Sequence, residues 1–381
     1  MTTEEVLTIT ASGILILLAI ITPLCNGLFR SPLRKKKSSN VTNGATPPLS
    51  IILTVHDQGY ELERNLPLLL SQKYDADFEV IVVDESSTDN TDDVLTLLKN
   101  KYSNLYTTFI PDSCHYLSRR KLALTIGIKA AKNEWLILTD ADCHPNSDKW
   151  LETISHHCND NTDIILGYSN YEYPTNSFYR FERLLTSCRL LRKAQRGIAY
   201  RYEGSNLAIR KSVFMSHNGF VKNLKYLRGE YDFLVNEYAL PGRTAVATEQ
   251  ETFMRQNEPT KKTWTNNHLY YMETRKHLKR SASYRSLYNF DTTILYVNYI
   301  LIVSAFIYSL VSSSIILTIA TSLSFIITLV MRILIARRTA LRFGEKLPCL
   351  LIPLMELRVM WQNAWFMLRH NRSDKYDFIR R

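Results

Sequence analysis

The chain has 381 residues, of which 45% are hydrophobic and 22% charged. This composition provides enough apolar surface for a full core, so it excludes a chain that is disordered throughout. The net charge of +11 is compatible with nucleic acid, anionic lipid or a phosphorylated substrate, and the positions of the basic residues must distinguish among these partners.

The six cysteines are scattered along the chain, with no CxxC pair and no regular spacing. Disulfide frameworks and zinc sites depend on such spacing, so we expect reduced thiols in a cytosolic compartment. The cysteines are Cys25, Cys114, Cys143, Cys158, Cys188 and Cys349.

The first apolar run, from Val6 to Phe29, contains no charged residue. At ~1.5 Å per residue it is long enough for the ~30 Å hydrocarbon core, so residues 1–30 are predicted to be a transmembrane anchor. A cleaved signal peptide would begin with basic residues, whereas here the basic run Arg34–Lys37 comes afterwards. This order places the N-terminus outside and predicts a basic, polar linker over residues 31–48.

Residues 49–285 alternate between strand-like and helical patterns. The runs LSIILTV, FEVIVVD, LYTTFI and EWLIL are apolar and rich in β-branched residues, and amphipathic segments separate them. Such alternation predicts an α/β domain, with a mostly parallel sheet and helices on both faces. Ligands bind beyond the carboxyl ends of the strands in this architecture, and Asp84, Asp140 and Asp142 lie at such ends.

The acidic pair Asp140 and Asp142 directly follows the apolar run WLIL. Carboxylate oxygens are the ligands that a hard divalent cation takes while its other positions remain open to phosphate and water. An Asx turn with a helix cap is the alternative, because Pro145 and Asn146 come next. Taken alone, the acidic pair leaves both interpretations open.

The segment FYRFERLLTSCRLLRKAQRG is predicted to be a helix with an apolar stripe beside a basic one. A solvated basic face is one interpretation of the second stripe. Binding of an anionic membrane lipid or lipid-linked acceptor is the other. The basic residues are Arg189, Arg192, Lys193 and Arg196.

A second uncharged run, from Thr292 to Met331, would be roughly 60 Å long as one helix, which is twice the bilayer core. It therefore predicts a transmembrane hairpin over residues 291–338 that turns at Ser312–Ser314. The basic flanks of all three spans agree on the cytoplasmic side, which predicts a multi-pass inner-membrane protein.

The last apolar segment carries Glu356 and Arg358 at its centre and Trp361 and Trp365 one turn apart. Residues 339–381 are accordingly predicted to form an interfacial amphipathic helix and a basic tail. A fourth span, or a helix packed on the globular domain, is the alternative.

With these motifs in order, about Leu49 to Arg280 resembles a bacterial-type, membrane-anchored glycosyltransferase of family 2 with the GT-A fold. The resemblance covers LSIILTVHDQGYELERNLPLLLSQKY, FEVIVVDESSTDNTDDV, RRKLALTIGIKAAKNEWLILTDADC and EGSNLAIRKSVFMSHNGF. It implies a nucleotide-diphosphate sugar donor, a Mg2+ or Mn2+ ion, and transfer with inversion to a lipid-linked or glycan acceptor. No nucleic-acid partner is expected, because much of the basic excess flanks membrane spans and the sequence has no recognisable RNA or DNA module.

The resemblance also implies roles for individual residues. The residues expected to bind the nucleotide sugar are Thr54, Asp84, Ser86, Lys121, Asp140 and Ala141. The metal ligands are Asp140 and Asp142, and the acceptor side is formed by Gly204, Asn206 and Arg210.

The string GEYDFLVNE departs from the family pattern, because Tyr231 stands where the second acid is usual. A tyrosine with a pKa near ~10 is a poor base at neutral pH. The catalytic base is therefore expected to be Asp232 or Glu230, with a slight preference for Asp232. Residues two apart on a helix face different ways, so only one of them is expected to reach the site.

A second departure concerns the Q-x-x-R-W element of processive polymerases, whose counterpart here contains Arg275, Lys276 and His277. The poor match favours single addition, with these three residues holding the diphosphate from a loop. The two departures also motivate an alternative hypothesis: a catalytically impaired membrane protein that binds sugar nucleotide as a sensor or assembly partner.

Overall fold

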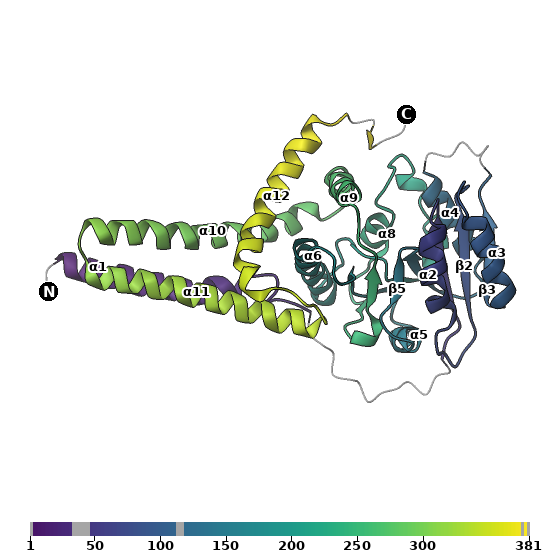
Figure 1. Ribbon diagram of the computed structural model, residues 1–381, viewed down its shortest axis with the longest axis horizontal. Helices are drawn as coiled ribbons and strands as arrows, with labels where there is room; N and C mark the ends of the chain where they lie inside the picture. The colour runs from purple at the N-terminus through teal and green to yellow at the C-terminus, as the bar shows by residue number, and fades with distance from the viewer. Residues whose placement is uncertain (1–2, 33–45, 112–117, 375–376, 379–381) are drawn as a thin grey trace. The chain divides into compact units, whose positions relative to one another are not determined.

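The computed structural model describes residues 3–32, 46–111, 118–374 and 377–378 (Figure 1). The basic run Arg34–Lys37, most of the predicted linker and Cys114 lie outside these residues. The chain divides into two compact units. We call one the membrane unit (Met1–Ser31, Asn176–Arg189 and Arg280–Ala364) and the other the sheet unit (Pro32–Thr175, Leu190–Lys279 and Trp365–Arg381).

The sheet unit contains two β-sheets. The strands are β1 (Leu49–Val55), β2 (Phe78–Asp84), β3 (Leu105–Phe109), β4 (Trp135–Asp140), β5 (Cys143–Pro145), β6 (Ile164–Leu166), β7 (Ser169–Tyr171), β8 (Leu207–Arg210), β9 (Thr244–Val246) and β10 (Met254–Gln256). The larger sheet has the order β3-β2-β1-β4-β8-β6-β9, and the smaller has the order β5-β10-β7.

The first four strands of the large sheet are parallel, as their alternation with helices predicts. Every residue of β1 is buried, as expected for a strand covered on both faces. Beyond β4 the sheet becomes mixed, because β8 pairs antiparallel with both β4 and β6. The predicted α/β class with a mostly parallel sheet is confirmed.

Helices connect these strands. The helices of the sheet unit are α2 (Gly59–Leu70), α3 (Thr91–Lys101), α4 (Arg119–Ala130), α5 (Trp150–Ser155), α7 (Lys211–Ser216), α8 (Glu230–Tyr238) and α9 (Lys261–Thr274), with the 3-10 turns Val221–Asn223 and Gln250–Thr252. Two helices contribute residues to both units: α6 (Ser177–Arg196) and α12 (Ile352–Arg372).

Helix α4 packs unusually close to the sheet at Gly127. A Cβ atom added there would lie 2.6 Å from Cγ2 of Ile52 on β1 and 3.2 Å from Cγ2 of Val83 on β2. Both neighbours are branched core side chains in the middle of the sheet, so they have little room to move.

We therefore expect Gly127→Ala to lower the free energy of unfolding by about 1–3 kcal/mol, through overpacking of the core. The thermal unfolding midpoint of the purified protein would measure this change. Gly197→Ala is the matched control, because its added Cβ would meet only the Lys193 carbonyl oxygen, at 3.8 Å. Equal midpoints for the two variants would contradict the prediction.

The C-terminal part of α12 packs against α9 within the sheet unit. The ring of Phe366 lies 5.4 Å from that of Trp264 and 4.4 Å from that of His268. One turn further along, His370 Nε2 lies 3.0 Å from a carboxylate oxygen of Glu273. Both Phe366 and Trp264 are buried, so this contact belongs to the core of the unit.

The membrane unit has three helices long and apolar enough to cross a membrane: α1 (Thr3–Leu24), α10 (Ser281–Val311) and α11 (Ile315–Arg342). Helix α1 packs against both α11 and α10. The chain turns between α10 and α11 at Ser312–Ser314, where Ser313 has a φ of 52°. A 3-10 turn, Cys349–Leu351, precedes α12.

Candidate active site

The register of the parallel strands brings the predicted acidic residues to one edge of the sheet. On β1, Val55 is paired with Asp84 of β2, and Thr54 is paired with Asp140 of β4. Asp84 and Asp140 therefore flank the same end of β1. All three strands end here, and ligands of such sheets bind beyond the carboxyl ends of the strands.

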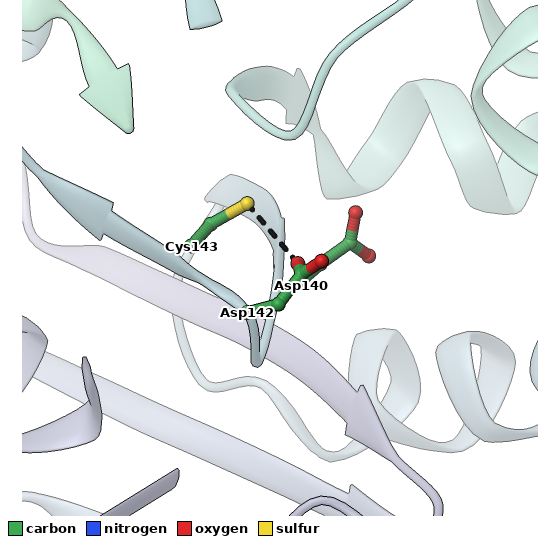
Figure 2. Close-up of side chains that lie close together, drawn as sticks. All are labelled: Asp140, Asp142 and Cys143. Atoms are coloured by element: carbon green, nitrogen blue, oxygen red, sulfur yellow. Dashed lines mark hydrogen bonds between the residues drawn. The ribbon is translucent and has the colours of Figure 1, made fainter. Parts of the chain in front are cut away.

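Two carboxylates and a thiol cluster in the turn after β4 (Figure 2). One ligand atom each from Asp140, Asp142 and Cys143 lie within 4.8 Å of one another. Cys143 Sγ donates a hydrogen bond to Asp142 Oδ1 over 3.3 Å. Burial, followed by the charge of Asp142, raises the pKa of this thiol well above its usual value, so it remains protonated and is a poor ligand for a hard cation.

The two carboxylates suit a divalent cation. Burial, and next the negative charge of Asp140, raise the pKa of Asp142 to about 6, although Gln256 Nε2 donates a hydrogen bond to it over 2.9 Å. A bound cation would offset the repulsion between the carboxylates, and their oxygens are the donor type that Mg2+ and Mn2+ prefer. The chain continues into β5 and reaches a helix only at Trp150, so the acidic pair does not cap a helix directly.

Three side chains hold Asp140, and the sequence predicted none of these contacts. Arg120 forms an ion pair with its Oδ1, Ser205 Oγ donates to its Oδ2, and the Tyr231 hydroxyl donates to Oδ1 over 3.0 Å. Burial, and next the charge of Asp140, raise the pKa of Tyr231 well above its usual value, so its phenol is a neutral donor. Helical spacing does not identify Arg120, because Arg120 and Lys121 both precede the buried Leu124 by about one turn.

The predicted nucleoside side is also ordered by local contacts. Asp84 accepts hydrogen bonds from the backbone N–H of Ser87 over 3.1 Å and from its hydroxyl over 2.5 Å. Ser86 lies between them with a φ of 62°, and its hydroxyl accepts from Arg119 Nη2 over 2.6 Å. These bonds fix the direction of the Asp84 carboxylate at the end of β2.

The two candidate bases lie in the first turn of α8 and face different surroundings. Gly229 caps this helix with a φ of 88°, which makes Glu230 its first residue. Glu230 Oε2 lies 3.9 Å from Arg120 Nε, and its buried Oε1 has no hydrogen-bond partner among the described residues. Asp232 instead lies 3.4 Å from Arg201 Nη1. Only Glu230 thus shares a partner with Asp140.

The ionisation of Asp232 makes a testable contribution to stability. Burial raises its pKa from 3.8 to about 6, even though Arg201 lowers it. A raised pKa means that the folded state holds the proton more tightly, so stability falls as the pH rises from 3.8 through 6. Asn mimics the protonated side chain.

As the pH rises from 5 to 8, we expect the free energy of unfolding of Asp232→Asn to increase by about 1 kcal/mol relative to that of the unmodified protein. Thermal unfolding midpoints of both proteins across this range would measure the gain. A difference that does not change with pH would show that Asp232 does not titrate there.

Lys121 lies beneath the loop that precedes α8. Its side chain is fully buried, and Nζ donates to the carbonyl oxygens of Asn223 over 2.8 Å and Tyr226 over 2.5 Å. Burial lowers its pKa to about 8. Its described contacts therefore support the backbone leading to Glu230, whereas the neighbouring Arg120 faces the acidic pair.

The residues assigned to the acceptor side have separate locations. Asn206 is buried, with its amide donating to the Thr252 carbonyl over 2.7 Å and accepting from Trp150 Nε1 over 3.3 Å. A Cβ on Gly204 would lie 2.6 Å from Ser169 Oγ, so this glycine permits close packing. Arg210 is paired with Trp135, at the start of β4, and the structure does not bring it to Asp140. The antiparallel direction of β8 explains this separation.

The predicted diphosphate loop forms the end of α9 and the residues after it. Lys276 Nζ and His277 Nε2 bind the Glu273 carboxylate over 2.8 Å and 3.3 Å. The His277 ring stacks on Tyr226 at 4.4 Å, and the Tyr226 carbonyl oxygen is a partner of Lys121. Arg275 begins the turn that follows the helix. His277 therefore braces the loop before α8, whereas Lys276 pairs with Glu273 of α9.

Part of the chain is similar in sequence to known proteins. Residues 50–217 match the family described as Glycosyl transferase family 2. Glycosyltransferase AglE of Haloferax volcanii is 27% identical over 130 residues, which are 34% of this chain and 41% of AglE. The chain thus matches about two fifths of the length of that relative.

Solved structures resemble the fold as well. Mannosyltransferase PcManGT from Pyrobaculum calidifontis, in complex with GDP-Man and Mn2+, has a TM-score of 0.51 and 14% identity, covering 93% of this chain and 99% of its own. S. aureus TarS 1–349 in complex with UDP-GlcNAc has a TM-score of 0.42 and 16% identity, covering 63% of this chain and 70% of its own. At such identities a structural likeness describes the fold alone. Residues 50–217 thus resemble Glycosyl transferase family 2 in sequence, and the chain as a whole shares its fold with the mannosyltransferase.

Proposed function

We propose that the protein transfers a sugar from a nucleotide-diphosphate donor to a lipid-linked or glycan acceptor, with inversion and by single addition. One observation carries this proposal: the carboxylates of Asp140 and Asp142 lie together where the strands end, across β1 from Asp84. In the proposed arrangement, Asp84 binds the nucleoside. Thr54, Ser86 and the backbone at Ala141 line the same strand ends.

A divalent cation fits the acidic pair, with Asp140 and Asp142 as its ligands from the chain. It would supply positive charge for the diphosphate that leaves with the nucleoside. The mannosyltransferase of similar fold was solved with GDP-Man and Mn2+, which supports a cation of this kind here. Arg120 adds a fixed positive charge beside Asp140, so we assign it to the diphosphate side of the site.

The proposed base is Glu230, with Asp232 as the alternative. A base must have a free oxygen within reach of the acceptor hydroxyl. Glu230 Oε1 is unpartnered among the residues that the structure describes, whereas Asp232 is held by Arg201. This geometry reverses the slight preference for Asp232 that the sequence pattern gave.

The membrane setting is proposed from the three candidate spans and their basic flanks. A cytoplasmic catalytic domain at the inner membrane follows from the excess of Lys and Arg on one side. An acceptor that is itself anchored in the membrane would be presented at this surface. We place α12 at the interface, in keeping with its paired tryptophans Trp361 and Trp365.

A donor screen tests the proposed function. Detergent-solubilised full-length protein would be incubated with UDP- and GDP-sugars and Mn2+ or Mg2+, and release of nucleoside diphosphate would be measured. We expect release with at least one donor and its loss on addition of EDTA. Release that is unaffected by EDTA would contradict the metal role. Donor binding with no turnover, across a panel of acceptors, would instead favour the sensor hypothesis.

A further inference from the structure

The membrane unit contains a polar cavity where five helical segments converge. It has a volume of about 30 Å3, enough for about two water-sized groups. Its lining residues come from α1 and the turn after it, α6, α10, α11 and α12. They are Thr22, Asn26, Leu185, Arg189, Tyr288, Asp291, Thr292, Leu295, Arg332, Glu356, Val359 and Met360.

Ion pairs already satisfy both carboxylates of the cavity. Arg332 Nη1 binds Glu356 Oε2 over 2.8 Å, with both side chains at most 4% exposed, and Asn26 donates to the other oxygen of Glu356. Arg30 forms an ion pair with Asp291. Buried charges persist in this way only when they are paired, so neither acid is left to bind a further cation.

Arg189 is the arginine of the cavity lining that forms no ion pair with a described carboxylate. In the described part of the chain, no carboxylate lies within 4.0 Å of its guanidinium, and its buried Nε has no hydrogen-bond partner. The guanidinium stacks over the Tyr288 ring at 4.6 Å, which fixes its position at the cavity wall. The lining itself holds two arginines and two carboxylates. Arg30, outside the lining, pairs with Asp291, so Arg189 is the lining cation without a carboxylate within ion-pair distance among the described residues.

Further unused donors point to a ligand with oxygen atoms. Thr22 is only 2% exposed, and its hydroxyl has no partner among the residues with described positions. The buried Nε of Arg332 is likewise unpartnered there. An unmade hydrogen bond at a buried polar atom is costly, so a ligand that accepts from these groups would be stabilised.

The depth of the cavity identifies the kind of ligand. Along α10, roughly 20 residues separate Asp291 from the end of the helix at Val311, which is ~30 Å and equals the hydrocarbon core. Along α11, Arg332 lies roughly 17 residues, or ~26 Å, from the start at Ile315. The cavity therefore lies one bilayer core away from the hairpin turn, at the depth of the headgroups on the basic side.

We propose that this cavity receives two oxygen atoms of the phosphate group of an anionic membrane lipid, with Arg189 as the principal contact. Phosphate oxygens can accept hydrogen bonds from the unpartnered donors of Arg189, Thr22 and Arg332. A guanidinium group is the side chain best suited to bind a phosphate. The apolar residues Leu295 and Val359 at the wall suit the adjoining hydrocarbon. This site extends beyond the proposed sugar transfer and concerns residues of the membrane unit alone.

Two sources can supply the phosphate: a phospholipid, with a phosphodiester, or a polyprenyl phosphate, with a monoester. The full chain would be reconstituted in phosphatidylcholine nanodiscs that contain a small fraction of either phosphatidylglycerol or a polyprenyl phosphate. Native mass spectrometry after release from the disc would count the retained lipids. The lipid that survives release identifies the source, and retention of either supports the proposal.

Arg189→Gln is expected to reduce this retention about tenfold or more, because it removes a charge-assisted contact. Arg338→Gln is the matched control, since Arg338 is an exposed arginine on α11 outside the cavity lining. Arg189→Lys keeps the charge and is expected to restore part of the retention; its unfolding midpoint would show whether the fold survives substitution at this position.

Equal loss in Arg189→Gln and Arg338→Gln would overturn the proposal, because it would indicate attraction by surface charge alone. An unmodified protein that retains neither lipid would also overturn it. Because the measurement needs no sugar nucleotide, failure here leaves the donor screen unaffected, and failure of the donor screen leaves this result standing.

Discussion

Asp142→Asn is expected to lower cation-dependent release of nucleoside diphosphate by about 100-fold or more. The substitution keeps the volume of the side chain and its neighbours Gln256 and Cys143, but removes one of two negative charges that would hold the cation. Charge that develops on the departing diphosphate would then be stabilised less well, and electrostatic contributions of this type are worth several kcal/mol.

A direct binding measurement separates this effect from loss of folding. The full chain would be titrated with Mn2+, and binding would be monitored by calorimetry or electron paramagnetic resonance. We expect Asp142→Asn to bind Mn2+ more weakly than the unmodified protein. Asp148→Asn is the control, because Asp148 is an exposed acid that pairs with Lys73 at the surface. Unchanged Mn2+ affinity and unchanged turnover in Asp142→Asn would rule out the metal role of the acidic pair.

Glu230→Gln is expected to lower sugar transfer by about 10^2-fold to 10^4-fold, while donor binding changes little. The amide cannot accept the proton of the acceptor hydroxyl, and loss of a general base has effects of this size. Gln retains the shape of Glu230 beside Arg120, so the site should remain assembled. Initial rates over a range of donor and acceptor concentrations would separate kcat from KM.

Asp232→Asn supplies the comparison for this result. Its carboxylate is held by Arg201, whose guanidinium also lies 3.7 Å from the centre of the Tyr271 ring. We expect a smaller loss of transfer than in Glu230→Gln. If Asp232→Asn is instead the more damaging substitution, the base is Asp232, and the position of its side chain must change when substrate binds.

The sequence predicted the features of the site that follow from strand order. Asp84 and Asp140 lie at the same sheet edge because both end parallel strands that flank β1, and hydrophobic runs are enough to predict such strands. The carboxylate pair is local in the chain, so its proximity was also predictable.

Contacts between distant segments could not be read from the sequence. Ser205 reaches Asp140 from 65 residues away, and Tyr231 does so from 91 residues away. Lys121 and Arg120 are adjacent basic residues, and only the packing of α4 shows which one faces the acids. For Arg210, the direction of β8 decides its distance from the site, and short strands give no sequence signal for pairing direction.

The end of α12 has a consequence for the design of soluble fragments of this protein. Phe366 fills space beside Trp264 and His268, although the 85 residues Arg280–Ala364 of the membrane unit lie between them in the chain. A soluble fragment that stops at Lys279 would leave the buried indole of Trp264 in water and Glu273 without His370. Fragments intended for solution work should therefore carry the last helical turns, joined by a short artificial connection.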